Sequence, residues 1–277
     1  MKKVKILQGS CIDKIKELED NSIDCVVSSP PYFGLRDYGV DEQFGLEKTY
    51  QDYLANTVKV FETFKPKLKD TATIWWNVGD SYSSGKRTST TNQSLRGNKE
   101  YGVTRTPVQN GIKEKDLLMI PNRVAIALQD AGWYVRSEII WHKPNPMPES
   151  VRDRPTSCHE KIWLITKNKK YFYDTEAIKE PCVTNDDTMK NKRNVWTVTS
   201  KPFKGAHFAT FPKDLIEPCI KAGCPEGGVV LDPFGGSGTT GIVSALNNRN
   251  AVLIELNTEY VKIAEKRIEN ELGLFNS

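Results

Sequence analysis

The most constraining feature of the sequence is an apolar run that ends in a carboxylate and leads directly into a glycine-rich turn. Residues 229–231 precede Asp232, and residues 233–241 contain four glycines. Short runs rich in β-branched residues are typical of buried strands, and glycine lets a backbone turn tightly and approach a ligand closely. The pattern predicts a strand, a ligand-binding turn and the start of a helix, which is the arrangement found in open α/β sheets.

The same stretch indicates a cofactor that contains a nucleoside. Glu255 closes the next apolar run about twenty residues later, where a carboxylate can accept hydrogen bonds from ribose hydroxyls. Residues 236–241 also match the G-x-G-x-x-G pattern, so a nicotinamide-dependent oxidoreductase remains an alternative. A phosphate-binding P-loop is excluded, because neither Lys-Ser nor Lys-Thr follows the glycines.

Short apolar runs alternate with longer amphipathic stretches along the chain, which favours a mainly parallel sheet with helices on both faces. Strands are expected at residues 4–7, 23–28, 71–78, 134–141, 161–166, 228–231 and 251–254. Helices are expected at residues 13–18, 48–64, 116–131, 213–222, 237–246 and 258–272. At 277 residues the chain fits a single domain, 1–277. Most strands precede the glycine-rich turn, so the cofactor-binding half comes last.

Two polar segments interrupt the alternation, at residues 81–115 and 174–204. Residues 84–115 contain seven basic and two acidic side chains, whereas the formal charge of the whole chain is only +4. A basic loop of this kind is either a solvated surface or a contact to a nucleic-acid backbone. We expect both segments to serve target recognition, with three candidate phosphate contacts in the first: Arg87, Arg96 and Arg105.

A second motif lies near the start of the chain, where an apolar run over residues 23–28 ends in Ser29-Pro30-Pro31-Tyr32. Two successive prolines end a strand, and ligands bind at this carboxyl edge of an α/β sheet. The Ser29 hydroxyl and the Pro30 carbonyl can accept hydrogen bonds from an exocyclic amine, and the Tyr32 ring can stack on a base. Taken alone, such a tetrapeptide more often marks an ordinary strand-ending turn.

Together the two motifs resemble the amino-group DNA methyltransferases, which use S-adenosylmethionine to methylate N4 of cytosine or N6 of adenine. The family's catalytic tetrapeptide, (S/D/N)-P-P-(Y/F/W), is matched by residues 29–32, and its cofactor motif, D-P-F-x-G-S-G-T-T, by residues 232–240. A catalytic motif that precedes the cofactor motif is the permuted order of the family's β group. Matches at residues 132–150, 158–167 and 206–212 extend the resemblance over most of the chain. It implies a Rossmann-like α/β methyltransferase fold.

The resemblance also implies roles for individual residues in a direct methyl transfer to a base rotated out of the duplex. The catalytic set is Ser29, Pro30, Pro31 and Tyr32. The cofactor-binding set, which surrounds the methionine part and the ribose of S-adenosylmethionine, is Asp232, Phe234, Gly235, Gly236, Ser237, Gly238, Glu255, Phe208, Thr210 and Phe211. Arg36 follows the catalytic motif and is a further candidate phosphate contact.

Several other kinds of site are not expected. The six cysteines show neither disulfide-framework nor zinc-ligand spacing, so no metal site is predicted. The Pro-Cys pairs at residues 181–182 and 218–219 are not expected to supply the nucleophile that cytosine-C5 methylation requires. No stretch approaches the roughly 18 apolar residues of a membrane span, so we expect a cytoplasmic protein with no membrane partner.

The target base is indicated only by the first residue of the catalytic motif. In the family, Ser at this position is usually associated with N4-cytosine and Asp with N6-adenine, although both side chains accept a hydrogen bond from an amine. Ser29 therefore favours N4 of cytosine, with N6 of adenine as the alternative. Double-stranded DNA is the expected partner and a cognate restriction endonuclease is a candidate partner. Whether the protein is a monomer or a homodimer is left open.

Overall fold

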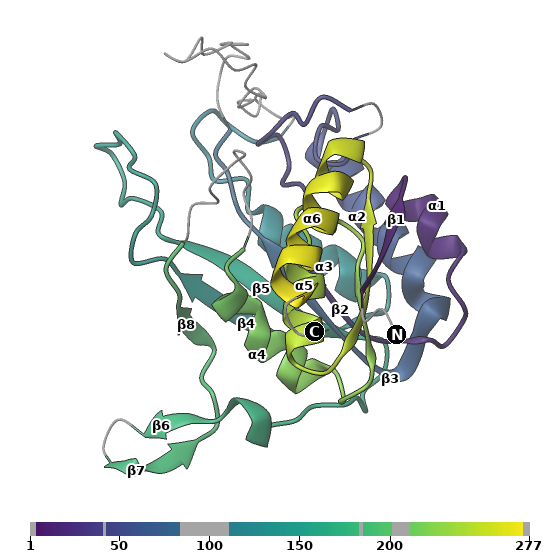
Figure 1. The fold of residues 1–277 in the computed structure, drawn as a ribbon. Coiled ribbons are helices and arrows are strands. Elements are labelled where there is room, and N and C mark those ends of the chain that lie inside the picture. Colours follow the sequence, from purple (N-terminus) through teal and green to yellow (C-terminus); the bar gives the residue numbers. More distant parts are fainter. Residues whose placement is uncertain (1–3, 41–42, 84–110, 183–184, 201–210, 274–277) are drawn as a thin grey trace.

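An eight-stranded sheet runs through the computed structural model, which describes residues 4–40, 43–83, 111–182, 185–200 and 211–273 (Figure 1). In spatial order its strands are β1 (Val4–Gln8), β10 (Asn250–Glu255), β9 (Val229–Asp232), β2 (Ile23–Ser28), β3 (Leu68–Val78), β5 (His159–Thr166), β4 (Tyr134–His142) and β8 (Val195–Thr197). Neighbouring strands are parallel except that β5 runs antiparallel to both β3 and β4. The predicted mainly parallel sheet is confirmed.

Within the described ranges, six α-helices cover the two faces of the sheet. On one face lie α1 (Cys11–Lys16), α2 (Tyr50–Phe64) and α3 (Ile120–Asp130), and on the other lie α4 (Lys213–Gly223), α5 (Thr239–Leu246) and α6 (Thr258–Leu272). The central strand β3 supplies both cores, because its side chains alternate between the faces. Ile74 and Trp76 pack with the α2 and α3 side, and Trp75 packs with the α4 side. The α/β fold with helices on both faces is therefore confirmed.

The turn between β9 and α5 depends on glycine. Gly236 and Gly238 have φ values of 49° and 83°, a backbone region that residues with a Cβ rarely adopt. A Cβ on Gly238 would also lie 3.2 Å from the Cβ of Ala264 in α6. The glycines thus let the chain reverse from β9 into α5 while α6 packs closely against the turn.

Residues 174–204 contain more regular structure than their polar composition suggests. They hold a 3-10 helix (Glu176–Ile178), a hairpin of β6 (Glu180–Cys182) and β7 (Asn185–Lys190), and the edge strand β8. These strands are only three to six residues long, too short to show the apolar periodicity that marks buried strands. β7 is also almost wholly polar, whereas β8 contains the buried Trp196. Figure 1 shows the hairpin projecting from the end of the sheet where the parallel strands begin.

Hydrogen bonds join the two ends of the first polar segment, residues 81–115. Ser83 N donates to Asp116 O at 2.9 Å, Lys115 N donates to Ser83 O at 2.8 Å, and Tyr82 bridges to Leu117. Residues 84–110, with most of the basic side chains, lie outside the described residues. Among those that are described, no helix is both long enough and apolar enough to cross a membrane.

Candidate active site

The two sequence motifs leave the sheet side by side. Strands β2 and β9 are parallel neighbours, with Val26 opposite Leu231, so both motifs begin at the same carboxyl edge. A hydrogen bond of 2.6 Å from Ser28 Oγ to Asp232 Oδ1 joins the two strand ends. Beyond it, residues 29–31 and 233–237 both contribute to the wall of one cavity of about 480 Å³. Chain segments about two hundred positions apart therefore share one pocket.

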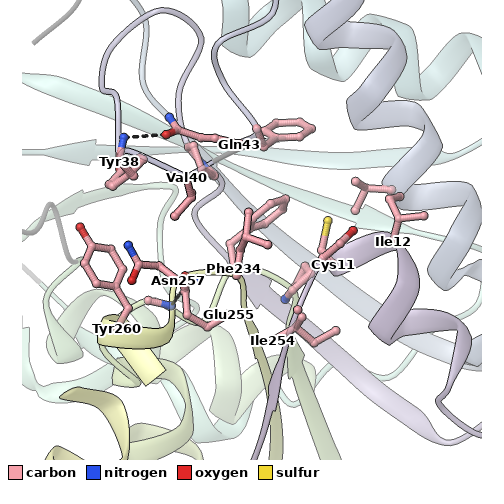
Figure 2. A pocket seen from close by; sticks show the side chains of 18 of the residues that line it. Cys11, Ile12, Tyr38, Val40, Gln43, Phe234, Ile254, Glu255, Asn257 and Tyr260 are labelled. Carbon is pink, nitrogen blue, oxygen red and sulfur yellow. Dashed lines mark hydrogen bonds between the residues drawn. The ribbon is translucent and has the colours of Figure 1, made fainter. Parts of the chain in front are cut away.

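Several other elements complete the wall of this cavity. They include the turn from β1 into α1, residues 38–40 and 43–47, the face of α2, the end of β10 and the start of α6. Figure 2 shows Tyr38 and Val40 opposite Asn257 and Tyr260. The rings of Tyr38 and Tyr260 meet edge to face, with centroids 6.1 Å apart. The volume lies within the range of small-molecule sites, which is about 300–1,000 Å³.

Glu255 lies at the end of β10 and presents a carboxylate to the cavity. Its two oxygens accept hydrogen bonds from Gly236 N and Asn257 N, each at 2.8 Å. Burial raises the pKa of this carboxyl above its usual range, although the two backbone donors oppose that shift. Each oxygen keeps a further lone pair. Because these lone pairs can accept hydrogen bonds, the Glu255 carboxylate fits the ribose hydroxyls of a nucleoside cofactor.

Asp232 is buried, whereas a direct contact to the cofactor requires a side chain that faces the cavity. It is only 2 % exposed, and its oxygens accept hydrogen bonds from Ser28 Oγ, Thr240 Oγ1 and Phe234 N at 2.6, 2.6 and 3.1 Å. Burial raises its pKa to about 6, even though these donors lower it. In this structure the carboxylate therefore organises the turn from within.

The other residues of the cofactor set fall into three groups. Phe234, Gly236 and Ser237 line the cavity with Glu255. Gly235 and Gly238 lie in the turn behind it, in close contact with β10 and α6. Phe211 is buried in the core beneath α4, and Phe208 and Thr210 lie outside the described residues. Gly9 and Ser10 also line the cavity, although the sequence motif did not include them.

The catalytic tetrapeptide ends in a polar cluster next to the cavity. Tyr32 Oη donates to Glu160 Oε2 at 2.6 Å and accepts a hydrogen bond from Ser29 Oγ at 3.1 Å. Asn77 Nδ2 lies 2.5 Å from Tyr32 Oη, 2.9 Å from Glu160 Oε2 and 3.3 Å from Ser29 Oγ. Burial and the neighbouring Glu160 carboxylate raise the pKa of Tyr32 well above its usual value, so its hydroxyl stays protonated.

Three members of this cluster were not predicted as site residues: Asn77, Lys143 and Glu160. Lys143 Nζ forms an ion pair with Glu160 Oε1 and lies 4.2 Å from the centroid of the Trp141 ring. Glu160 is the second residue of β5, which runs antiparallel to β3, so the start of β5 reaches the carboxyl edge of its neighbours. The available signal was a polar pair, His159-Glu160, directly before an apolar strand.

Of the four candidate DNA contacts, one arginine lies within the described residues. Arg36 is half-buried in the loop that forms one wall of the cavity, where its carbonyl accepts a hydrogen bond from Gln43 Nε2 at 2.7 Å. Arg87, Arg96 and Arg105 lie outside the described residues. Within the described part of the chain, no three His, Cys, Asp or Glu side chains are grouped to hold a metal ion.

Comparison with known families decides the assignment. The family model N6_N4_Mtase, a DNA methylase, matches residues 23–266. The chain belongs to this family. It is an S-adenosylmethionine-dependent DNA amino-methyltransferase, which excludes the nicotinamide-dependent oxidoreductase considered above.

Curated relatives support the same assignment over nearly the whole chain. The Type II methyltransferase M.Cfr9I of Citrobacter freundii is 48% identical over 266 residues, which cover 96% of this chain and 88% of the relative. The Type II methyltransferase M.SmaI of Serratia marcescens is 47% identical over 268 residues, which cover 97% of this chain and 91% of the relative.

Solved structures show the same methyltransferase fold. The PvuII DNA methyltransferase, named as cytosine-N4-specific, has a TM-score of 0.72 at 18% identity and covers 99% of this chain and 91% of its own. A putative DNA modification methylase from Thermus thermophilus, complexed with S-adenosyl-L-methionine, has a TM-score of 0.62 at 21% identity, with coverage of 97% and 95%.

Proposed function

We propose that this DNA methyltransferase modifies N4 of cytosine in duplex DNA. The observation that carries the proposal is Ser29, a neutral acceptor that borders both the cavity and the polar cluster at Tyr32. The family usually pairs Ser at this position with N4-cytosine. One observation favours the alternative, N6 of adenine: Glu160 adds a carboxylate within 2.6 Å of Tyr32 Oη, so an anionic acceptor is present even without Asp at position 29.

The cavity residues are proposed to bind and orient the cofactor. S-adenosylmethionine, when bound, supplies a methyl group made electrophilic by the positive sulfur. Glu255 accepts hydrogen bonds from the ribose hydroxyls, while Phe234 and the backbone at Gly236 contact the rest of the molecule. Asp232 holds the turn that carries these two residues. Phe44 packs on Phe234, with ring centroids 5.2 Å apart.

The tetrapeptide is proposed to bind the extruded base beside this cavity. Ser29 Oγ and the Pro30 carbonyl accept hydrogen bonds from the exocyclic amine, and the Tyr32 ring stacks on the base. Pro31 fixes the backbone between them, and its carbonyl accepts a hydrogen bond from Tyr53 Oη at 3.2 Å. Because the amine is a weak nucleophile, alignment of reacting groups supplies much of the acceleration.

Nucleoside analysis tests the proposal directly. The protein is incubated with isotopically labelled S-adenosylmethionine and unmethylated duplex DNA of mixed sequence, and the digested nucleosides are identified by mass spectrometry. We expect labelled N4-methylcytosine. Labelled N6-methyladenine would show that the target is adenine and not cytosine. Label found only in an equivalent RNA sample would show that DNA is not the substrate.

Target recognition is proposed for residues 81–115 and for residues 174–204. The base of the first segment lies at the edge of the sheet that carries the catalytic motif, because Ser81 and Ser83 follow β3 directly. In the second segment, β8 leads toward the same edge, whereas the β6–β7 hairpin lies at the other end. The Type II names of the relatives support a cognate restriction endonuclease as a partner and a cytoplasmic location beside the chromosome.

A further inference from the structure

We propose that Glu160 is a base-contacting residue, whose Oε2 accepts a hydrogen bond from the exocyclic amine of the target base. The inference rests on the proposed methyl transfer to a flipped base and extends it to a residue outside the family's two motifs. In this proposal the amine takes the place that the Tyr32 hydroxyl fills in the structure, between Ser29 Oγ and Glu160 Oε2.

The hydrogen bonds of Tyr32 show where a donor in this position binds. The ring that should stack on the base instead points its hydroxyl into the cluster, 3.1 Å from Ser29 Oγ. There the hydroxyl donates to Glu160 Oε2 at 2.6 Å, the short distance typical of a bond to a carboxylate. An amine N–H that approaches Ser29 Oγ therefore also reaches Glu160 Oε2. For the base to enter, the Tyr32 hydroxyl must leave, and this exchange frees Oε2.

The surroundings of Glu160 hold the carboxylate in place for this exchange. Its side chain is 17 % exposed, and that of Lys143 is 19 % exposed. Lys143 binds Oε1, while Asn77 Nδ2 donates to Oε2 at 2.9 Å, so the carboxylate keeps its orientation when Tyr32 moves. A carboxylate fixed in this way does not have to reorganise when the amine arrives.

The cluster also contains a hydrogen-bond acceptor that Tyr32 does not use and that is available to the edge of a base. Asn77 Oδ1 is buried and has no hydrogen-bond partner among the described residues. A buried acceptor without a partner costs about 1–3 kcal/mol and marks a place where a donor is missing. An exocyclic amine has two N–H groups, whereas the Tyr32 hydroxyl has one. The site is thus better matched to an amine than to the side chain that now fills it.

The first experiment compares Glu160→Gln with Glu138→Gln under single-turnover conditions, on the DNA that the wild-type protein methylates. Glu138 is a matched control, because it lies on the adjacent strand β4 and forms an ion pair of 2.5 Å with Lys161. We expect Glu160→Gln to lower the methylation rate roughly 10- to 100-fold, as for loss of a charged hydrogen bond. Cofactor affinity should stay near wild type, and the control rate should stay within about twofold. A wild-type rate for Glu160→Gln would overturn the proposal.

A double-mutant cycle with Tyr32→Phe separates base contact from support of Tyr32. Phe keeps the stacking ring and removes the hydroxyl that occupies the site. If Glu160 binds the amine, Glu160→Gln lowers the rate by a similar factor in the Tyr32→Phe background. If Glu160 acts only by holding the Tyr32 hydroxyl, Glu160→Gln has no further effect there. That second result would overturn the proposal.

Two measures keep the test decisive. If Glu160→Gln does not fold, Glu160→Asp keeps the charge beside Lys143 but withdraws the oxygens by one methylene, and a wild-type rate for this variant would overturn the proposal. The nucleoside formed by the wild-type protein is identified first. An N6-methyladenine product would refute the cytosine assignment and leave the comparison at Glu160 valid, since both bases carry an exocyclic amine.

Discussion

The buried carboxylate of Asp232 makes a prediction about stability that can be worked out from the structure. The side chain is 2 % exposed, and its pKa rises from the usual 3.8 to about 6, because burial outweighs the three hydrogen bonds that it accepts. At about 1.4 kcal/mol per pKa unit, ionising this group in the folded protein costs about 3 kcal/mol relative to the unfolded chain. The variant Asp232→Asn keeps the shape of the side chain and removes this cost.

The sign of the effect follows from where the protons are bound. Below about pH 4 the carboxyl is protonated in both states, whereas between pH 4 and 6 it is protonated only in the folded state. The folded state then binds more protons, so its stability falls as the pH rises through that window and levels off above about pH 7. We expect the unfolding free energy of Asp232→Asn minus that of wild type to increase by about 2.5 kcal/mol from pH 4 to pH 8, because part of the full effect already lies below pH 4.

Urea denaturation followed by tryptophan fluorescence at several pH values measures this difference. The variant Asp13→Asn, on the surface of α1 with a side chain 70% exposed, controls for the loss of one negative charge. A difference between Asp232→Asn and wild type that stays constant from pH 4 to pH 8 would refute the reasoning. It would mean that Ser28, Thr240 and the turn amide stabilise the anion enough to offset its burial.

Four further predictions concern the site and the DNA contacts. In Gly79→Ala the new Cβ would lie 2.5 Å from Cε2 of Tyr32, so the ring is displaced. We expect at least a tenfold lower single-turnover rate with unchanged cofactor affinity, and a normal rate would show that the ring does not need this position. In Glu255→Ala we expect roughly tenfold weaker cofactor binding by calorimetry, from the loss of charged hydrogen bonds; wild-type affinity would remove this carboxylate from the ribose site. Cys182→Ser and Cys219→Ser should methylate DNA at wild-type rates, and loss of turnover in either folded variant would contradict direct transfer. The last prediction concerns the basic insertion, in which three arginines are replaced together by alanine: Arg87, Arg96 and Arg105. DNA binding should weaken and depend less on salt, and unchanged binding across a salt series would place the insertion outside the interface.

Much of the fold was readable from the sequence because its strands are short, apolar and separated by amphipathic helices. The predicted bounds of β2 agree with the structure, and those of β3, β9 and β10 differ by a few residues. Helix α2 begins at Tyr50, two residues after its expected start, because the Thr49 hydroxyl caps it by accepting a hydrogen bond from Asp52 N at 3.1 Å. Local signals of this kind act over a few residues, so the sequence displays them directly.

The edge of the sheet was harder to predict. Strands β6, β7 and β8 are only three to six residues long, and β8 is held by pairing with β4 and by the burial of Trp196. The partner of β8 comes from a distant part of the chain, residues 140–142 of β4. A periodicity within the strand therefore cannot reveal that pairing.

By itself, the sequence predicted a nucleoside-cofactor site at a strand-turn-helix unit with Asp232, Gly236 and Glu255, and it placed Ser29 and Tyr32 at a strand end. These are short-range patterns in which the order of residues dictates the backbone. Only the tertiary structure decided that Asp232 is buried beneath the turn and that Glu160 enters the cluster at Tyr32. Glu160 stands there because β5 runs against its neighbours, and strand direction is set by packing and hydrogen bonding across the whole sheet.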